Sequence, residues 1–110
     1  MQVVAGFLAS VDDGKLVTDE NWKCTNTLFE NWMLPTFDDS AWENASISGT
    51  NTASDIHKVL SAISSNAKWI WTNKFSGNTI DKTVYCRGYF SKFVVAQRSV
   101  LTIDIVVSLS

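Results

Sequence analysis

Apolar residues recur at every second position in several stretches of this chain, which is the spacing of a half-buried β-strand. Residues 3–11 follow this period, and an Asp-Gly turn at 12–15 predicts a hairpin whose second arm is 15–18. The period returns over residues 84–90 and, most regularly, over residues 101–109. The chain is therefore expected to fold mainly into antiparallel strands.

Between these strands the pattern changes several times. Residues 69–71 form a short aromatic and β-branched run, typical of a strand, whereas residues 24–52 and 72–81 are rich in polar loop residues. One short helix is predicted near residues 55–63, where apolar side chains have helical spacing: Ile56, Val59, Leu60 and Ile63. The whole pattern predicts an all-β fold, an antiparallel β-sandwich.

Length and charge limit what this fold can do. The chain has 110 residues, which predicts a single domain over residues 1–110, and 45% of them are hydrophobic. Nine basic against eleven acidic residues give a net charge of −2, so no basic surface is expected for nucleic acid. The uncharged opening run, residues 1–11, is too short to span a bilayer, and it lacks the basic residue that begins a signal peptide.

The most patterned local motif is residues 37–42, Phe-Asp-Asp-Ser-Ala-Trp. Asp38 and Asp39 are either calcium ligands or an acid/base pair, or they cap a tight turn that brings Phe37 and Trp42 into one apolar layer. We favour the turn, because adjacent carboxylates on a turn rarely converge on one atom. A structural calcium ion stays possible, but no cofactor or metal site is predicted.

Catalysis is not expected of these residues. His57 is the only histidine, and it lies beside the apolar stripe of the predicted helix. No nucleophile motif, second metal ligand or glycine-rich phosphate loop accompanies it. The chain is therefore predicted not to be an enzyme.

Aromatic residues are the strongest candidates for ligand binding. Of the five tryptophans, Trp22, Trp42 and Trp69 are expected in the core, whereas for Trp32 and Trp71 burial and exposure are equally expected. An exposed indole would stack on a sugar ring, and loop amides would bind its hydroxyl groups. The candidate ligand-binding residues are therefore Trp32, Trp71, Asn51, Asn66 and Asn73.

The interpretation of two further features depends on whether the protein is secreted into an oxidising compartment. Cys24 and Cys86 are either one disulfide or two buried thiols, and their spacing does not decide between the two. Residues 44–46 form an N-glycosylation sequon at Asn44, which matters only if the chain is secreted.

Four motifs follow one another in an order that resembles the galactose-binding-like β-sandwich. This family is the non-catalytic jelly-roll module of β-galactosidases and α-L-rhamnosidases, and related extracellular modules occur in invertebrate animals. The resemblance spans residues 5 to about 103 and is carried by Asn21-Trp22-Lys23-Cys24, by Trp32 and Phe37-Asp38-Asp39-Ser40-Ala41-Trp42, by Ala67-Lys68-Trp69-Ile70-Trp71, and by Val84-Tyr85-Cys86-Arg87-Gly88-Tyr89-Phe90.

The resemblance implies a secreted, disulfide-bonded jelly roll in which Cys24 pairs with Cys86, and whose end loops often bind carbohydrate. It implies a lectin-like, non-catalytic carbohydrate-binding module; the alternative is a structural or adhesive extracellular module that packs against neighbouring domains. Tryptophans and cysteines are expected to hold two facing sheets together. Family members continue through further strands where this chain ends, so the chain is expected to be either a fragment truncated at the C-terminus or a shortened sandwich with an exposed sheet edge. Self-association through such an edge is also expected.

Overall fold

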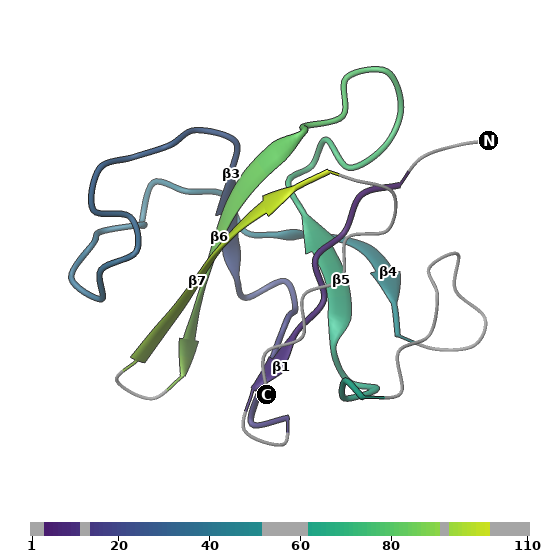
Figure 1. The fold of residues 1–110 in the computed structure, drawn as a ribbon, viewed down its shortest axis with the longest axis horizontal. Helices are drawn as coiled ribbons and strands as arrows, with labels where there is room; N and C mark the ends of the chain where they lie inside the picture. The colour runs from purple at the N-terminus through teal and green to yellow at the C-terminus, as the bar shows by residue number, and fades with distance from the viewer. Residues whose placement is uncertain (1–3, 12–13, 52–61, 91–92, 102–110) are drawn as a thin grey trace.

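The computed structural model describes residues 4–11, 14–51, 62–90 and 93–101 of the chain, and these form antiparallel β-strands without a helix (Figure 1). All further structural statements concern these residues. The strands are β1 (Ser10–Val11), β2 (Leu16–Val17), β3 (Lys23–Thr25), β4 (Ser46–Thr50), β5 (Lys68–Trp71), β6 (Thr83–Phe90) and β7 (Phe93–Val100).

The strands form two layers, as in a small β-sandwich. One layer is the sheet with the order β3-β6-β7. The other contains the β4-β5 pair, extended by the segment around Phe7, which exchanges backbone hydrogen bonds of 2.8 and 2.9 Å with Ile70. The β1-β2 hairpin adjoins this layer, because the Lys68 amide donates to the Thr18 carbonyl at 2.8 Å.

Large aromatic side chains fill the space between the layers. Phe7 and Trp22 meet edge to face with ring centroids 5.8 Å apart, and both are buried with Trp71 and Val84. The indole N–H groups are hydrogen-bonded, Trp22 to the Val17 carbonyl at 2.8 Å and Trp71 to the Asp81 carbonyl at 3.0 Å. Burial of each such side chain contributes about 1.5–3 kcal/mol, and the hydrogen bonds avoid the cost of an unpaired donor.

Trp22 also explains why a glycine lies in the middle of a long strand. Its ring covers the backbone of Gly88 in β6, so closely that a Cβ atom at this position would overlap the indole. A glycine in a strand normally weakens it, but here it allows a core aromatic ring to lie directly against the strand backbone.

The cysteines form a disulfide between Cys24 of β3 and Cys86 of β6, which confirms the pairing that the resemblance implies. The two residues lie opposite each other in the antiparallel register, with their Cα atoms 4.2 Å apart. The bond therefore joins neighbouring strands of one sheet, and the expectation that it connects the two facing layers is wrong. Packing of side chains such as Trp22 and Phe7 connects the layers instead.

Several predicted strands are confirmed. The hairpin predicted around the Asp-Gly turn is present as β1 and β2, and residues 69–71 and 84–90 lie in β5 and β6. The first strand is shorter than expected, because residues 4–9 make only isolated bridges, at Val4 and Phe7.

Two strands were not predicted. β4 lies inside the segment 24–52 that was expected to be a loop, because Ser-Ile-Ser-Gly-Thr lacks a clear apolar alternation. β7 was missed because it begins with a continuous apolar run of four residues, Phe-Val-Val-Ala, without the period of two.

Other predictions fall outside the described residues. The predicted helix near 55–63 and His57 lie outside the described residues. Only the last two residues of that segment are described, Ala62 in a turn and Ile63 in a bend. Of the predicted strand 101–109 only Leu101 is described. The described residues contain no helix of a length and hydropathy that would span a membrane.

Candidate functional site: an apolar loop held by a buried arginine

Residues 26–42 connect β3 to the bridge at Asn44, and we call them the display loop. They cover the face of the β3-β6-β7 sheet that points away from the sandwich core. Trp32 packs edge to face on Tyr85 of β6, with centroids 5.1 Å apart, and Trp42 joins the same buried cluster. Because the loop lies on this face, the middle of β6, residues 84–88, is buried on both sides.

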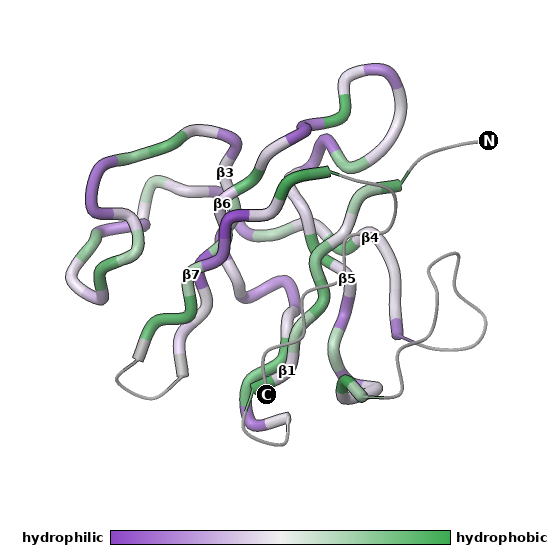
Figure 2. Tube along the Cα trace, in the orientation of Figure 1, coloured by the Kyte–Doolittle hydropathy of each residue, from purple (hydrophilic) through white to green (hydrophobic). Residues whose placement is uncertain are grey.

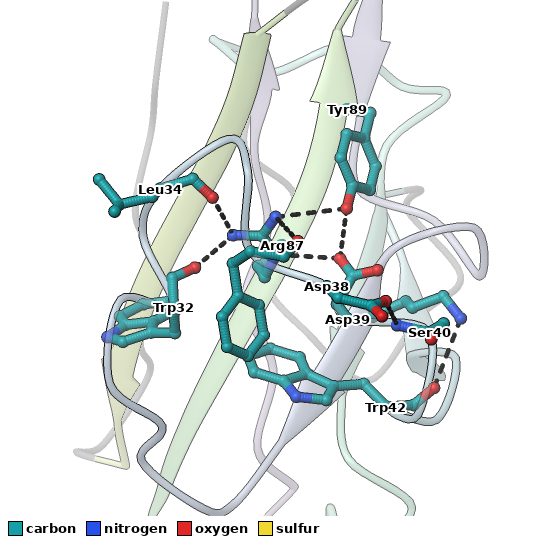
Figure 3. Close-up of polar contacts among 10 residues, drawn as sticks. Trp32, Leu34, Asp38, Asp39, Ser40, Trp42, Arg87 and Tyr89 are labelled. Carbon is teal, nitrogen blue, oxygen red and sulfur yellow. Dashed lines mark hydrogen bonds and ion pairs between the residues drawn. The ribbon is translucent and has the colours of Figure 1, made fainter.

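The backbone of the display loop is held by Arg87 of β6, whose side chain is fully buried (Figure 3). Its Nη1 donates to the carbonyl oxygens of Trp32 and, at 3.0 Å, of Leu34, and its Nη2 donates to the carbonyl of Phe37 at 3.2 Å. One guanidinium group therefore binds three carbonyls of a single loop. The planar, multiply donating head of arginine suits this task, and lysine could not reproduce it.

The charge of Arg87 is balanced by Asp39. The Nε of Arg87 donates to Asp39 Oδ2 at 2.9 Å, and the Tyr89 hydroxyl donates to the same oxygen at 2.6 Å. The guanidinium also lies 5.1 Å from the centroid of the Phe37 ring. A buried charge is tolerated only when it is paired and hydrogen-bonded, and this cluster satisfies both conditions.

The cluster shifts the pKa values of two of its members. Burial by itself lowers the pKa of Arg87, but the hydrogen bonds with Tyr89 and Asp39 outweigh it, and the pKa lies above its ordinary value. Burial, followed by the hydrogen bond to Asp39, raises the pKa of Tyr89. Both shifts favour the protonated forms, a cationic Arg87 and a neutral Tyr89, which donate the hydrogen bonds of the cluster.

The two neighbouring aspartates of the loop have different roles. Asp38 is exposed and accepts a hydrogen bond from the Ser40 amide at 3.0 Å, and the hydrogen bonds from Ser40 lower its pKa. Asp39 is buried and faces Arg87. The Phe37 and Trp42 rings meet at 5.5 Å, which agrees with the turn interpretation of this motif.

The loop presents apolar side chains to solvent. Leu28 is 65% exposed, Met33 59%, Leu34 48% and Phe29 41%. They account for most of the large exposed apolar residues among the described ones, and Figure 2 shows hydrophobic stretches alternating with hydrophilic ones along this loop. The loop contains acidic Glu30, Asp38 and Asp39 but no lysine or arginine.

The sequence-predicted ligand residues do not converge. Trp71 is fully buried in the core between the layers, whereas Trp32, 7% exposed, belongs to the separate cluster under the display loop. Asn51 is buried and donates to the Ile63 carbonyl at 3.1 Å, so only Asn66 and Asn73 are exposed. Neither predicted indole offers an open ring face to a sugar, because packing against the protein already covers it.

Asn44 and the acidic groups can be placed as well. Asn44 is exposed, and its Nδ2 donates to the Glu20 carbonyl at 2.8 Å. Within the described part of the chain, no three histidine, cysteine, aspartate or glutamate side chains are arranged to hold a metal ion.

Sequence reasoning missed Arg87, the central residue of the loop anchor. The available signal was a charged residue flanked at i−2 and i+2 by Tyr85 and Tyr89, on the same strand face. An arginine between two aromatic residues on one face indicates a face that is covered, and the paired aspartates supply the counter-ion. The distance of 48 residues between Arg87 and Asp39 left no local pattern to connect them.

Comparison with protein-family models, with curated proteins and with solved structures found no match to this chain. The resemblance to the galactose-binding-like modules therefore rests on the sequence motifs alone.

Proposed function

We propose that this protein is a non-catalytic adhesive or structural module that binds a protein partner through the display loop. The observation that carries the proposal is the exposure of Leu28, Phe29, Met33 and Leu34 on a loop whose backbone is anchored by buried Arg87. Exposed clusters of apolar side chains mark interaction sites, because their burial by a partner is favourable.

The anchor supports this function through preorganisation. A free loop loses conformational entropy when it binds, and this loss weakens the complex. Here the carbonyls of Trp32, Leu34 and Phe37 are already fixed to the sheet, so Met33 and Leu34 are displayed at little further entropic cost.

Charge favours a protein over a membrane as the partner. Loops that bind anionic lipid surfaces carry lysine or arginine beside their apolar residues. The display loop has none, whereas Glu30 and Asp38 are exposed on it. The complementary surface is therefore an apolar patch with basic residues at its rim.

The disulfide between Cys24 and Cys86 fits an oxidising compartment. We extend this to secretion, in agreement with the extracellular modules that the sequence motifs resemble. The exposed Asn44 then becomes an acceptor for an N-linked glycan, and treatment of the secreted protein with an amidase for such glycans would lower its mass.

Photocrosslinking tests the protein partner directly. A diazirine amino acid replaces Met33 in the display loop or, as the control, exposed Thr79 on another loop, in cells that secrete the protein. We expect a protein adduct from position 33 that is absent from position 79 and is lost when Leu34→Glu is added. The same adducts from both positions, or adducts indifferent to Leu34→Glu, would contradict the proposal.

A second candidate is carbohydrate binding at Tyr89. This side chain is 48% exposed, and its hydroxyl is fixed to Asp39, so a held aromatic ring lies beside a carboxylate. Sugars bind such pairs by stacking and by hydrogen bonds from their hydroxyl groups. A glycan array with the wild type and with Tyr89→Ala separates the candidates: glycan signals that disappear with Tyr89→Ala support this one, and an empty array excludes it.

A further inference from the structure

β7 is the last strand of the β3-β6-β7 sheet, and its outer side has no partner among the described residues. The opposite end of the sheet is different, because the Cys24 amide of β3 donates to the Glu43 carbonyl at 3.1 Å. Among the described residues, the edge of this layer without a partner strand is therefore β7, which is eight residues long.

The register defines which backbone groups of β7 point outward. The Cys24 amide points away from β6, so Cys24 and Cys86 are a non-hydrogen-bonded pair, and the Cys86 backbone groups point to β7. Cys86 lies opposite Gln97, which is then hydrogen-bonded to β6. Alternation leaves the N–H and C=O groups of four residues pointing outward: Val94, Ala96, Arg98 and Val100. Of these groups, the Arg98 carbonyl accepts a hydrogen bond from the side chain of its neighbour, Gln97 Nε2, at 2.8 Å.

An independent hydrogen bond supports this assignment. The Leu101 amide donates to the Lys82 carbonyl, which continues the register of β6 and β7 by one pair. Leu101 has the same parity as Gln97, so odd-numbered residues of β7 face β6 and even-numbered residues face outward.

The edge also lacks the features that natural sheets use to prevent pairing. Such edges carry proline, several charges or a bulge. β7 contains no proline and a single charge, Arg98, and it pairs with β6 without a register shift.

From these observations we infer that two copies of this chain associate by antiparallel pairing of their β7 strands, which joins their sheets into one. The occupant of the edge is a second copy because β7 complements itself. A two-fold axis at Gln97 places Val94 opposite Val100 of the second copy and Ala96 opposite Arg98 of the second copy. All four outward-facing residues then pair with outward-facing residues.

Charge selects this register over its neighbour. A shift of the axis to Arg98 would place the two arginines directly opposite each other, and like charges at this position destabilise a ladder. With the axis at Gln97, each arginine lies opposite an alanine. The two glutamine side chains meet at the centre, where the Nε2 of each donates to the Arg98 carbonyl of its own chain at 2.8 Å.

The display loop lies beside the same edge. Ala96 of β7 packs on the cluster that contains Trp32, and Figure 3 shows Trp32 and Leu34 on the β7 side of Arg87. Pairing through β7 therefore brings half-exposed Leu34 toward the second copy. Burial of its apolar side chain then stabilises the dimer in addition to the backbone hydrogen bonds.

Proline substitution tests the pairing. Arg98→Pro removes an outward N–H but no hydrogen bond to β6, whereas Arg98→Ala removes the same charge and keeps the N–H. In sedimentation equilibrium across micromolar concentrations, we expect dimers for the wild type and for Arg98→Ala, and at least tenfold weaker association for Arg98→Pro. Retention of the near-ultraviolet circular dichroism spectrum shows that the variant is folded.

Cysteine crosslinking tests the register. Because the Gln97 backbone groups face β6, the two copies of Gln97 on the axis form a non-hydrogen-bonded pair. The Cα atoms of such a pair are about 4.5 Å apart, within the range of a disulfide. Gln97→Cys is expected to give a disulfide-linked dimer on mild oxidation, whereas Arg98→Cys is not. A wild type that is monomeric throughout, equal association of the proline and alanine variants, or crosslinking through position 98 instead of 97 would overturn the inference.

Discussion

Arg87 shows how one residue organises a segment that has no regular structure. Its guanidinium binds carbonyls at Trp32, Leu34 and Phe37, which otherwise lack partners in a strand or helix. Buried backbone carbonyls require hydrogen bonds, and the loop itself supplies only some of them, such as the bond from the Phe37 amide to the Leu34 carbonyl at 3.1 Å. The arginine therefore replaces secondary structure as the source of order in the display loop.

The first prediction concerns the counter-ion of this arginine. Asp39→Asn keeps the shape of the side chain but leaves a buried guanidinium without its charge partner. We expect the free energy of unfolding in urea to fall by about 3–5 kcal/mol. Lys68→Ala, which removes an exposed ion pair with Glu20, is the control and should leave the unfolding midpoint unchanged. Equal effects of the two variants would contradict the role of Asp39.

The second prediction concerns pH. Folding raises the pKa of Tyr89, because burial and the hydrogen bond to Asp39 favour its protonated form. Its contribution to stability is therefore complete below the ordinary pKa of 10.0 and is lost as the pH rises through the higher pKa of the folded state. The free energy of unfolding in urea, measured at increasing alkaline pH, should fall in the wild type and fall less in Tyr89→Phe. Identical pH profiles would exclude Tyr89 as the source.

Among the elements, β6 makes structural contacts through both of its faces. Its inward face holds Cys86 and the close contact between Gly88 and Trp22, and its outward face holds Tyr85, Arg87 and Tyr89. A strand with both faces covered is well protected from local opening, because opening it would expose both the core and the loop anchor.

The third prediction tests the covalent part of this element. The disulfide closes a long loop, because Cys24 and Cys86 have a sequence separation of 62. Its loss in a Cys24→Ala/Cys86→Ala double variant should lower the free energy of unfolding by about 2–5 kcal/mol. Thiol titration of the wild type should find no free thiol in either the native or the unfolded protein. A reductant should shift the wild-type midpoint toward that of the double variant and leave the variant itself unchanged.

The elements also show how far the sequence is informative. Residues 69–71 and 84–90 were predictable because apolar and aromatic residues in them mark burial directly. β4 and β7 were not, since their pairing depends on backbone partners distant in sequence rather than on their own side-chain alternation. The candidate site was the least predictable part. The Arg87–Asp39 contact joins a strand residue to a loop residue, and no local sequence motif contains both of them.

At the scale of the whole molecule, the tryptophans are buried in three places, and Trp69 lies in a small cluster with Leu8, Ile63 and Ala67. Trp22 and Trp71 lie between the layers, whereas Trp32 and Trp42 lie under the display loop on the outer face of one sheet. A small domain gains a second buried region in this way, without a third layer of secondary structure.

The fourth prediction follows from this distribution. All five tryptophans are at most 7% exposed, so acrylamide should quench their fluorescence far less in the native protein than in urea. Arg87→Lys should release the loop and make Trp32 and Trp42 accessible, while Trp22, Trp69 and Trp71 stay protected. A strongly quenched wild type, or a variant with unchanged quenching, would contradict the description of the loop as a fixed cover.

The guanidinium of Arg87 contacts the main chain of the loop and none of its outward side chains. Every amino acid supplies the same carbonyl group. Leu28, Met33 and Leu34 can therefore be exchanged for other residues while the hydrogen bonds of Arg87 to the loop stay unchanged. The proposed recognition surface is thus separable from the architecture that holds it: substitution at a few outward positions can change this surface, in evolution or in the laboratory, on an unchanged frame.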